Sequence, residues 1–527
     1  METAFYLVSA SLAGLFCFLL SFSYMHMFQL EGYRAKGYLK WLMQYGFGSV
    51  LAVIGMAILY ALTYMLRAVL GEIAGWILLA AFIALGVLFL CKFRVKDAKN
   101  PLVYTSRVKR MFCCEGIVLL LLCYLGYLAG GAILAILVAL APLYLIAANT
   151  INAPIEELVR RHYLKDAKRK LQERPELIKI GITGSYGKTS TKFILGTILS
   201  EKYSVLVPPS SYNTPMGLTR VIRESLKEEH QVFLAEMGAK HKGDIAELVE
   251  LVQPSMGIIT SVGPQHLETF GNIETIAQTK YELIAGLPEQ GKAFFPNDGA
   301  ICKQLYDQTE KMQKCLFALE GERADWDIAA GDIVCGEGGS SFTIRDREGN
   351  GFSAKTKLLG KHNILNILGC VAIARELGLS DAQIQAGIEK IEPVEHRLQL
   401  LPTNNGVTVI DDAFNANPAG TRVAMEVLSG FSGRKFVVTP GMVELGEAED
   451  AENKAFGKNM AGVADFVFLV GPRHTRPIYD GLLEAGFDSQ HIFVGSSLAE
   501  ASQKMGKMLR AGDVVLFEND LPDNYNE

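Results

Sequence analysis

Residues 177–195 read LIKIGITGSYGKTSTKFIL, and this stretch decides the fold of the larger part of the chain. An apolar run over residues 177–180 precedes a turn rich in glycine, and a helical pattern follows from Thr191. Strand, glycine turn and helix form the order of a phosphate-binding loop. The glycines let backbone N–H groups close around phosphate oxygens, and the helix N-terminus adds a partial positive charge. The stretch therefore predicts a binding site for a nucleoside triphosphate.

Within this loop, Lys188 is expected to reach the β- and γ-phosphates, and the Thr189 hydroxyl to bind Mg²⁺. The strict G-x-x-x-x-G-K-[ST] spacing is not met, because Ile182 stands at the first glycine position. The residues expected around the phosphates are Gly184, Ser185, Tyr186, Gly187, Lys188, Thr189 and Ser190.

The composition divides the chain of 527 residues into an apolar and a soluble part. Hydrophobic residues make up 50% and the mean hydropathy is +0.21, with the excess concentrated before residue 150. The net charge of -5 gives no reason to expect nucleic acid as a partner. The nine cysteines form no C-x-x-C pair, so we expect reduced thiols rather than a metal site.

Five apolar stretches are each long enough to cross a bilayer, which takes about 20 helical residues. They lie near residues 4–28, 42–66, 73–91, 111–128 and 131–149. The start Met1-Glu2-Thr3 lacks the basic region of a signal peptide, which favours a first span. Lys and Arg gather after the first, third and fifth stretches, and such basic segments stay in the cytoplasm.

We therefore expect a multi-pass region of the plasma membrane over residues 1–150, with the N-terminus outside. A basic cytoplasmic linker is expected over residues 151–175, followed by catalytic domains in the cytoplasm. Mid-span positions hold almost no ionisable residues, which favours an anchor over a transporter. A grip on a lipid-linked substrate remains an alternative role for the spans.

From about residue 175, short apolar runs alternate with amphipathic segments, as in a mainly parallel sheet wrapped by helices. A hairpin turn is expected over residues 346–350. A second block starts after Pro393, with strands expected near 407–411, 435–439, 466–470 and 514–518. We predict two α/β domains with a ligand cleft between them: a P-loop-type central ATP-binding domain over residues 176–395 and a Rossmann-like C-terminal domain over residues 396–527.

Several polar residues follow predicted strands, where open α/β sheets bind ligands. Glu236 follows the strand at 232–235 and places a carboxylate where the Mg²⁺ of a nucleotide would lie. From spacing alone, His266 would be a hydrogen-bonded structural residue and Lys280 a solvated one. The run from Asp412 to Pro418 would by itself be a turn that starts a helix.

Together these motifs resemble the Mur ligase family, whose phosphate loop has the same irregular glycine spacing. The matching segments, in order, are Thr183–Ser190, Glu236–Ile245, Gly263–Glu268, Ala277–Ile284, Asn297-Asp298, Gly360–Asn363, Arg397, Asp412–Pro418 and Gly441–Glu447. The Asn-Ala-Asn-Pro and Glu-Leu-Gly-Glu elements are similar to those of the MurF branch. That branch adds D-Ala-D-Ala to the UDP-linked muramoyl tripeptide.

The resemblance implies an ATP-dependent peptide ligase that forms a C–N bond through an acyl phosphate, with two Mg²⁺ ions. Thr189 and Glu236 would hold the first Mg²⁺, and His266 with Lys280 as a carbamate would hold the second. The implied catalytic residues are Lys188, Lys280, His266 and Arg397. Asn297, His362 and Asn363 would contact the adenine side, and Arg397 and Asp412 the γ-phosphate and ribose. The residues expected to face the substrates are Asn213, Thr214, Asn415 and Asn417.

Two departures leave the substrates open. Membrane spans stand where family members carry an N-terminal UDP-binding domain. In addition, Glu518-Asn519-Asp520 stands where MurF-type enzymes have a Lys-Gly-Ser-like segment near the incoming dipeptide, which favours a different amine or a different means of holding it.

We expect a small-molecule or lipid-linked peptide precursor and an amino acid or dipeptide as substrates, with cell-wall or export proteins as partners. One alternative is a ligase of another polymer such as poly-γ-glutamate. A non-catalytic ATP-binding membrane sensor is less favoured, because the residues for both Mg²⁺ sites are present.

Overall fold

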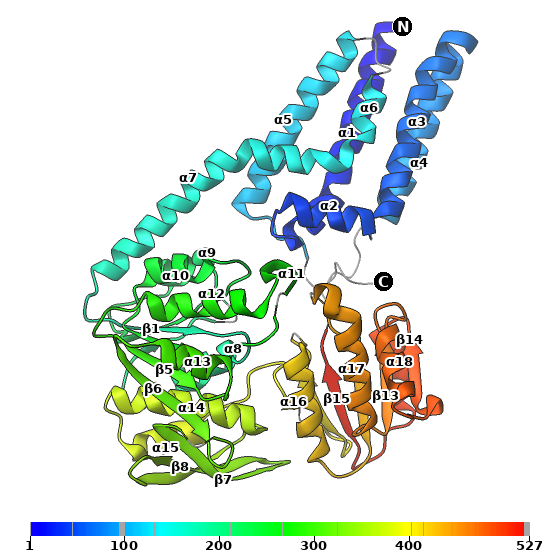
Figure 1. Ribbon diagram of the computed structural model, residues 1–527. Helices are drawn as coiled ribbons and strands as arrows, with labels where there is room; N and C mark the ends of the chain where they lie inside the picture. Colours follow the sequence, from blue (N-terminus) through cyan, green and yellow to red (C-terminus); the bar gives the residue numbers. More distant parts are fainter. Residues whose placement is uncertain are drawn as a thin grey trace. The chain divides into compact units, whose positions relative to one another are not determined.

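The computed structural model describes residues 2–44, 46–93, 101–129, 133–209, 212–265, 267–323, 325–401, 403–414, 416–443 and 445–520. The chain forms two units, which are described separately below. The first is a helical unit that ends at Arg161, and the second begins at His162 and contains both sheets (Figure 1).

Four helices of the first unit are long and apolar enough to cross a membrane. They are α1 (Glu2–Leu30), α3 (Phe47–Leu70), α4 (Glu72–Lys92) and α5 (Ser106–Leu128). Aromatic side chains such as Phe5, Tyr60 and Phe82 fill the core between them, while many Leu and Ile side chains face outward. An apolar outer surface around a packed core is typical of helices that contact lipid.

The prediction of a fifth spanning helix over residues 131–149 is wrong. The described part of this stretch is broken into α6 (Leu134–Ala139), the 3₁₀ turn η1 (Ala141–Leu143) and the start of α7 (Tyr144–Gln172). Pro142 has no backbone N–H to continue a helix. Two buried tyrosines satisfy carbonyls at the break: Tyr38 of α2 (Ala35–Gln44) donates to the Pro142 carbonyl at 2.8 Å, and Tyr144 donates to the Leu137 carbonyl at 2.6 Å.

Two further features of this unit differ from expectation. The segment expected as a linker over residues 151–175 is helical as far as Gln172, since α7 continues through Pro154.

On α5, Glu115 is only 1% exposed, and its carboxylate oxygens have no hydrogen-bond partner among the described residues. An ionisable residue is therefore buried inside a predicted span.

The second unit begins with a sheet of nine strands in the order β2-β3-β1-β4-β5-β6-β7-β8-β9. The strands from β2 to β7 run parallel, and β7, β8 and β9 are antiparallel. The expected hairpin turn over residues 346–350 is confirmed between β8 and β9, where the Asp346 N–H donates to the Asn350 carbonyl. The strands are β1 (Ile178–Thr183), β2 (Val205–Leu206), β3 (Val232–Glu236), β4 (Met256–Ile259), β5 (Lys292–Pro296), β6 (Gln313–Leu319), β7 (Ile328–Gly336), β8 (Gly339–Asp346) and β9 (Gly351–Thr356).

Helices cover both faces of this sheet, as the alternating sequence pattern predicts. One core lies under α8, α14 and α15, and the other under α9, α10, α12 and α13. The helices are α8 (Lys188–Leu199), α9 (Pro215–Glu224), α10 (Asp244–Val252), α11 (Leu267–Phe270), α12 (Ile273–Ala285), α13 (Ile301–Gln308), α14 (Lys361–Glu376) and α15 (Asp381–Glu389).

A second sheet follows, with six strands in the order β10-β11-β15-β12-β13-β14. All four predicted strands are confirmed, and β10 and β14 were not predicted. The strands are β10 (Gln399–Leu401), β11 (Thr408–Asp412), β12 (Lys435–Thr439), β13 (Phe466–Val470), β14 (Ile492–Gly495) and β15 (Val514–Glu518). The helices are α16 (Pro418–Ser429), α17 (Glu449–Ala461), α18 (Arg476–Glu484) and α19 (Leu498–Gly506), with 3₁₀ turns η2 (Gly446–Ala448) and η3 (Ser489–His491).

The strand register brings the predicted site residues to the carboxyl ends of the strands. In the first sheet, Ile182 at the end of β1 pairs with Glu236 at the end of β3. In the second sheet, Asp412 at the end of β11 pairs with Glu518 at the end of β15. In both sheets, loops at these ends carry the motifs found in the sequence.

The broken segment of the helical unit leads to a stability prediction. Tyr38→Phe should destabilise the protein by about 1–3 kcal/mol, because it leaves the buried Pro142 carbonyl without a donor. Thermal unfolding of the detergent-purified chain measures this effect, with Tyr104→Phe, whose side chain is exposed, as the control. Equal melting temperatures for the two variants would contradict the structural role of this hydrogen bond.

Candidate nucleotide and ligase site

The phosphate-loop glycines are required by the backbone. Gly184 has φ +152° and Gly187, the N-cap of α8, has φ +79°, a region that side-chain-bearing residues rarely adopt. A Cβ atom on Gly184 would lie 2.1 Å from the Thr260 hydroxyl oxygen, and one on Gly187 would lie 2.9 Å from the Asn366 amide oxygen. The turn therefore needs glycine at both positions.

The loop is held in shape by the segment after β4. The Ser185 N–H donates to the Ser261 carbonyl at 2.8 Å, and the Ser185 hydroxyl donates to the Gly263 carbonyl at 2.9 Å. The Tyr186 N–H donates to the Ser261 hydroxyl at 2.9 Å. This segment leads to His266, the predicted Mg²⁺ ligand, which lies outside the described residues.

Lys188 lies on the loop itself. Its ammonium donates to the Gly184 and Ser185 carbonyls at 2.7 and 2.9 Å. The pKa of Lys188 is lowered to about 8, mainly by burial; the charge of Glu236 opposes the shift and that of Arg397 contributes to it. A cation that is desolvated in this way favours an anionic ligand such as phosphate.

Glu236 is the point at which several predicted residues meet. One of its carboxylate oxygens accepts hydrogen bonds from the Thr189 hydroxyl and the Asn213 amide, each at 3.1 Å. These partners come from α8 and from the loop before α9, so one carboxylate joins three segments. Thr214, the neighbour of Asn213, instead caps α9 by accepting from the Gly217 N–H.

Lys192 is a site residue that the sequence interpretation missed. Its ammonium lies 3.2 Å from the second Glu236 oxygen, and the two side chains are 0% and 1% exposed. Burial lowers the pKa of Lys192, and the charge of Glu236 opposes that shift. The sequence did contain a sign of this role. Lys192 lies one helical turn after Lys188, on a helix whose other buried side chains are mostly apolar.

Lys280 is buried on α12, not solvated as its spacing alone indicated. The side chain is 2% exposed, and its ammonium lies 5.9 Å from the centre of the Phe270 ring. Burial lowers the pKa of Lys280 to about 7, and the charge of Lys188 adds to the shift. In the described part of the chain, no three His, Cys, Asp or Glu side chains cluster as metal ligands.

The residues expected on the adenine side differ in what they contact. The Asn297 amide donates to the Asp325 carbonyl and accepts from the Gly299 N–H, and the Asn363 amide donates to the Leu359 carbonyl. Both amides are thus used in local backbone contacts. The His362 Nδ1 atom is buried without a hydrogen-bond partner, and burial lowers the pKa of this residue to about 4.

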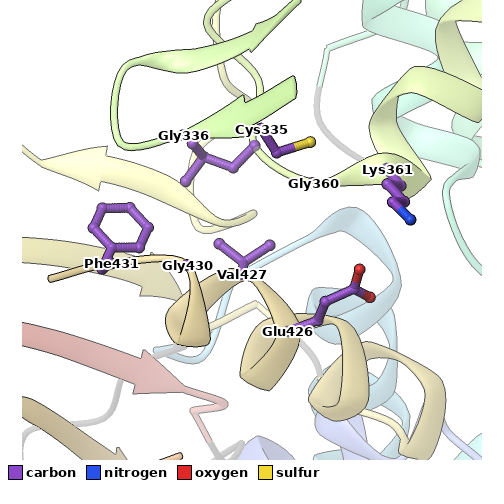
Figure 2. A pocket seen from close by; sticks show the side chains of 9 residues that line it. Cys335, Gly336, Gly360, Lys361, Glu426, Val427, Gly430 and Phe431 are labelled. Atoms are coloured by element: carbon purple, nitrogen blue, oxygen red, sulfur yellow. The ribbon is translucent and has the colours of Figure 1, made fainter. Parts of the chain in front are cut away.

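A pocket lies beside the start of α14, between the two sheet domains of the second unit. Its cavity volume is about 90 Å³. Figure 2 shows Lys361 and Glu426 on one side of it, with Val427 and Phe431 from α16 and the following turn along its floor. The cavity is smaller than the pockets that usually hold organic ligands, so it is not assigned one.

Arg397 lies in the segment that joins the two sheet domains. Its neighbours His396 and Leu398 have φ +58° and +46°, which is strained for residues with side chains. The guanidinium lies 4.3 Å from the centre of the Phe414 ring. Burial lowers the pKa of Arg397, while the charges of Asp412 and Glu236 raise it, so Arg397 is within electrostatic reach of both domains.

At the end of β11, Asp412 accepts a hydrogen bond from the Leu398 N–H at 3.1 Å. Burial raises the pKa of Asp412 to about 6, although that hydrogen bond and Arg397 oppose the shift. Asn417 caps α16 by accepting from the Gly420 N–H, and Asn415 lies outside the described residues. Glu518, which pairs with Asp412 across the sheet, was not among the predicted site residues.

Comparisons with known proteins support the resemblance. Residues 182–374 match the model of the Mur ligase middle domain, and residues 396–518 match the model described as Mur ligase, glutamate ligase domain. The UDP-N-acetylmuramoyl-tripeptide--D-alanyl-D-alanine ligase of Bacillus subtilis (strain 168) is 30% identical over 67% of this chain and 75% of its own length.

Two solved structures are similar to this chain in fold. MurF from Acinetobacter baumannii has a TM-score of 0.63 at 26% identity, covering 69% of this chain and 78% of that one. The MurF ligase from Thermotoga maritima in complex with ADP has a TM-score of 0.61 at 27% identity, covering 68% of this chain and 80% of that one. With both domain models matched in order and the B. subtilis relative covered over 75% of its length, the chain belongs to the Mur ligase family of ATP-dependent ligases that form amide bonds.

Proposed function

We propose that this chain is a membrane-anchored ligase of the MurF type, which joins a carboxylate to an amine through an acyl phosphate in the synthesis of a peptidoglycan precursor. The observation that carries the proposal is the convergence of Thr189 and Asn213 on buried Glu236, beside the Lys188 loop. The names of the relatives supply the first substrates to test: a UDP-N-acetylmuramoyl tripeptide and D-alanyl-D-alanine.

At the ATP end, the loop from Gly184 to Ser190 would hold the phosphates, with Lys188 as the cation beside them. The Thr189 hydroxyl and the Glu236 carboxylate fit a first Mg²⁺. Their oxygens lie 3.1 Å apart, and both are the hard oxygen donors that this ion prefers. When bound, Mg²⁺ neutralises charge on the transferred phosphoryl group.

His266 and Lys280 are proposed for the second Mg²⁺, with Lys280 as a carbamate. The amine is buried and its pKa is lowered to about 7, so much of it is neutral at physiological pH. A neutral amine can attack CO₂, forming an N–C bond and releasing one proton. The product carries a negative charge, which removes the repulsion between a buried ammonium and Lys188.

The substrate carboxylate would then attack the γ-phosphorus atom, and ADP would leave. The incoming amine would attack the acyl carbon, and phosphate would leave as the amide forms. Arg397, in the segment between the two sheet domains, would place a second cation near the phosphates. Closure of the domains about that segment would keep water from the acyl phosphate.

The apolar helices α1, α3, α4 and α5 support membrane attachment. We propose a plasma-membrane location with the ligase domains in the cytoplasm, where ATP is available. Attachment would keep the enzyme close to later, lipid-linked steps of cell-wall synthesis.

A substrate screen with the full-length chain in detergent tests the proposal. ATP is supplied with a UDP-muramoyl tripeptide, a lipid-linked precursor or poly-γ-glutamate as the carboxylate, and with D-alanyl-D-alanine or glutamate as the amine. We expect ADP formation only when a carboxylate and an amine are both present, with a product mass equal to their condensation. Hydrolysis of ATP that is independent of both substrates would overturn the proposal.

Lys188→Ala should abolish ADP formation, because the loop loses the cation that faces the phosphates. Lys311→Ala, which removes an exposed lysine of the same domain, is the matched control and should keep the native rate. Turnover by the Lys188 variant at the control rate would show that the phosphate loop is misassigned.

Lys280→Ala should lose activity and regain part of it with added formate or acetate, which would replace the carbamate oxygens. In the native chain, activity should fall below a pH of about 7, because protonation of the amine prevents reaction with CO₂. Rates measured across pH and acid concentration check both effects. Full activity of the variant without added acid would rule out the carbamate.

Lys192→Met should reduce the free energy of unfolding by about 3–5 kcal/mol, because it leaves the Glu236 carboxylate buried without its cation. Lys192→Arg keeps the charge and should retain more of the stability. Chemical denaturation compares the variants, and a Met variant as stable as the native chain would contradict the importance of this ion pair.

A further inference from the structure

The outer side of α7 has a feature that the proposed function does not use. Three of its large apolar side chains are exposed: Ile151 by 54%, Ile155 by 50% and Leu158 by 68%. Their spacing of four and three residues places them in one line along the helix, which we call the α7 stripe. Single apolar side chains are common on protein surfaces, but a contiguous line of them marks a surface that contacts something else.

The start of α7 is tied to the ends of two predicted spans. The Asn149 side chain accepts a hydrogen bond from Arg107 at 2.8 Å and donates one to the Tyr33 carbonyl at 3.3 Å. Arg110 donates two hydrogen bonds to the Glu156 carboxylate, at 2.7 and 2.9 Å. Both arginines belong to the first turns of α5, and Tyr33 follows the end of α1. This part of α7 is therefore held at the level where one span ends and another begins.

The same part of α7 does not run along the spans. In Figure 1 it crosses the direction of α1 and α5. Its inward side is buried, with Leu145 in the core of the helical unit and Ala148 and Asn152 almost fully covered. At 100° per residue, the α7 stripe lies about a quarter turn around the helix from that inward side. One side of α7 thus faces protein, and the stripe faces outward beside it.

Polar side chains border the stripe. Thr150 is exposed on the other outer side of the helix, where Glu157 forms an ion pair with Arg161 at 2.6 Å. Further along α7, the spacing of the stripe continues to Lys165, which is exposed. A helix that is apolar on one side, polar on another and basic toward one end is typical of a segment that lies in a membrane surface.

A bilayer accounts for the stripe better than a second protein does. Three side chains in one line offer far less apolar area than the ~800 Å² per partner that a stable protein interface buries. They lie where the apolar outer surface of the spans ends, because α7 is fixed to the first turns of α5. A bilayer surface offers acyl chains to the apolar side chains and phosphate groups to Lys165.

We propose that the α7 stripe lies in the surface of a phospholipid bilayer, with Ile151, Ile155 and Leu158 among the upper acyl-chain carbons and Lys165 near the phosphate groups. This inference rests on the proposed membrane attachment. The chain then contacts the membrane through two kinds of element: helices that cross it and a helix that lies in its surface.

Photocrosslinking of the full-length chain in phospholipid vesicles tests this placement. p-Benzoylphenylalanine replaces Ile155 in one variant and Thr150, on the polar side of the same helix, in a second. A third variant carries it in place of Ile117, which is 57% exposed near the middle of α5. Adducts are identified by mass after irradiation. We expect lipid adducts at positions 155 and 117, and several-fold fewer at position 150.

A second measurement separates a helix in the membrane surface from one that crosses the bilayer. Leu158→Trp adds a fluorophore to the three native tryptophans, and the difference from the native spectrum isolates its emission. We expect lipids brominated near the carbonyl end of the acyl chains to quench this emission several-fold more than lipids brominated near the methyl end. Ile117→Trp is the matched control on a span and should show the opposite preference.

Three results would overturn the inference. The first is equal lipid adduct formation at positions 150 and 155, and the second is an adduct at position 155 to protein alone, whether to the ligase domains or to a second copy of the chain. The third is stronger quenching of the Leu158→Trp emission near the methyl end. A lack of lipid adducts at position 117 would refute the proposed membrane attachment, whereas adducts at 117 without any at 155 would refute only the placement of the α7 stripe.

Discussion

The site depends on one buried carboxylate. Glu236 is 1% exposed at the end of β3, and its charge is balanced by Lys192 from α8. With that pair in place, the remaining oxygen can accept from Thr189 and Asn213 at the same time. Removal of either charge leaves the other desolvated, a situation far more costly than the loss of a surface ion pair. The phosphate loop and the loop before α9 therefore keep their positions through Glu236.

A surplus of positive charge surrounds this carboxylate. Burial lowers the pKa of Lys188 and of Lys280, and the charge of one acts on the other. Such a cluster is less stable than one with matched charges, and a triphosphate or a carbamate would supply the missing anions. In the C-terminal sheet, burial raises the pKa of Asp412 and of Glu518, and the two carboxyl groups share a hydrogen bond.

The sequence predicted what depends on local pattern and missed what depends on tertiary packing. The phosphate loop was predictable because Gly184 and Gly187 mark a backbone turn that other residues cannot make. The role of Lys192 depends on Glu236, which lies on a strand about 40 residues further along the chain. The prediction of a fifth span was wrong because it rested on the length of an apolar stretch, whose helix Pro142 interrupts.

The left-handed residues on either side of Arg397 have a consequence for motion. Each such conformation costs about 1–2 kcal/mol relative to the ordinary helical region. A rotation at this segment that relaxed His396 or Leu398 would recover part of that energy, so the backbone strain would favour a change in the angle between the two sheet domains. Glycine at position 396 or 398 would relieve this strain without altering any group that is proposed to contact a substrate.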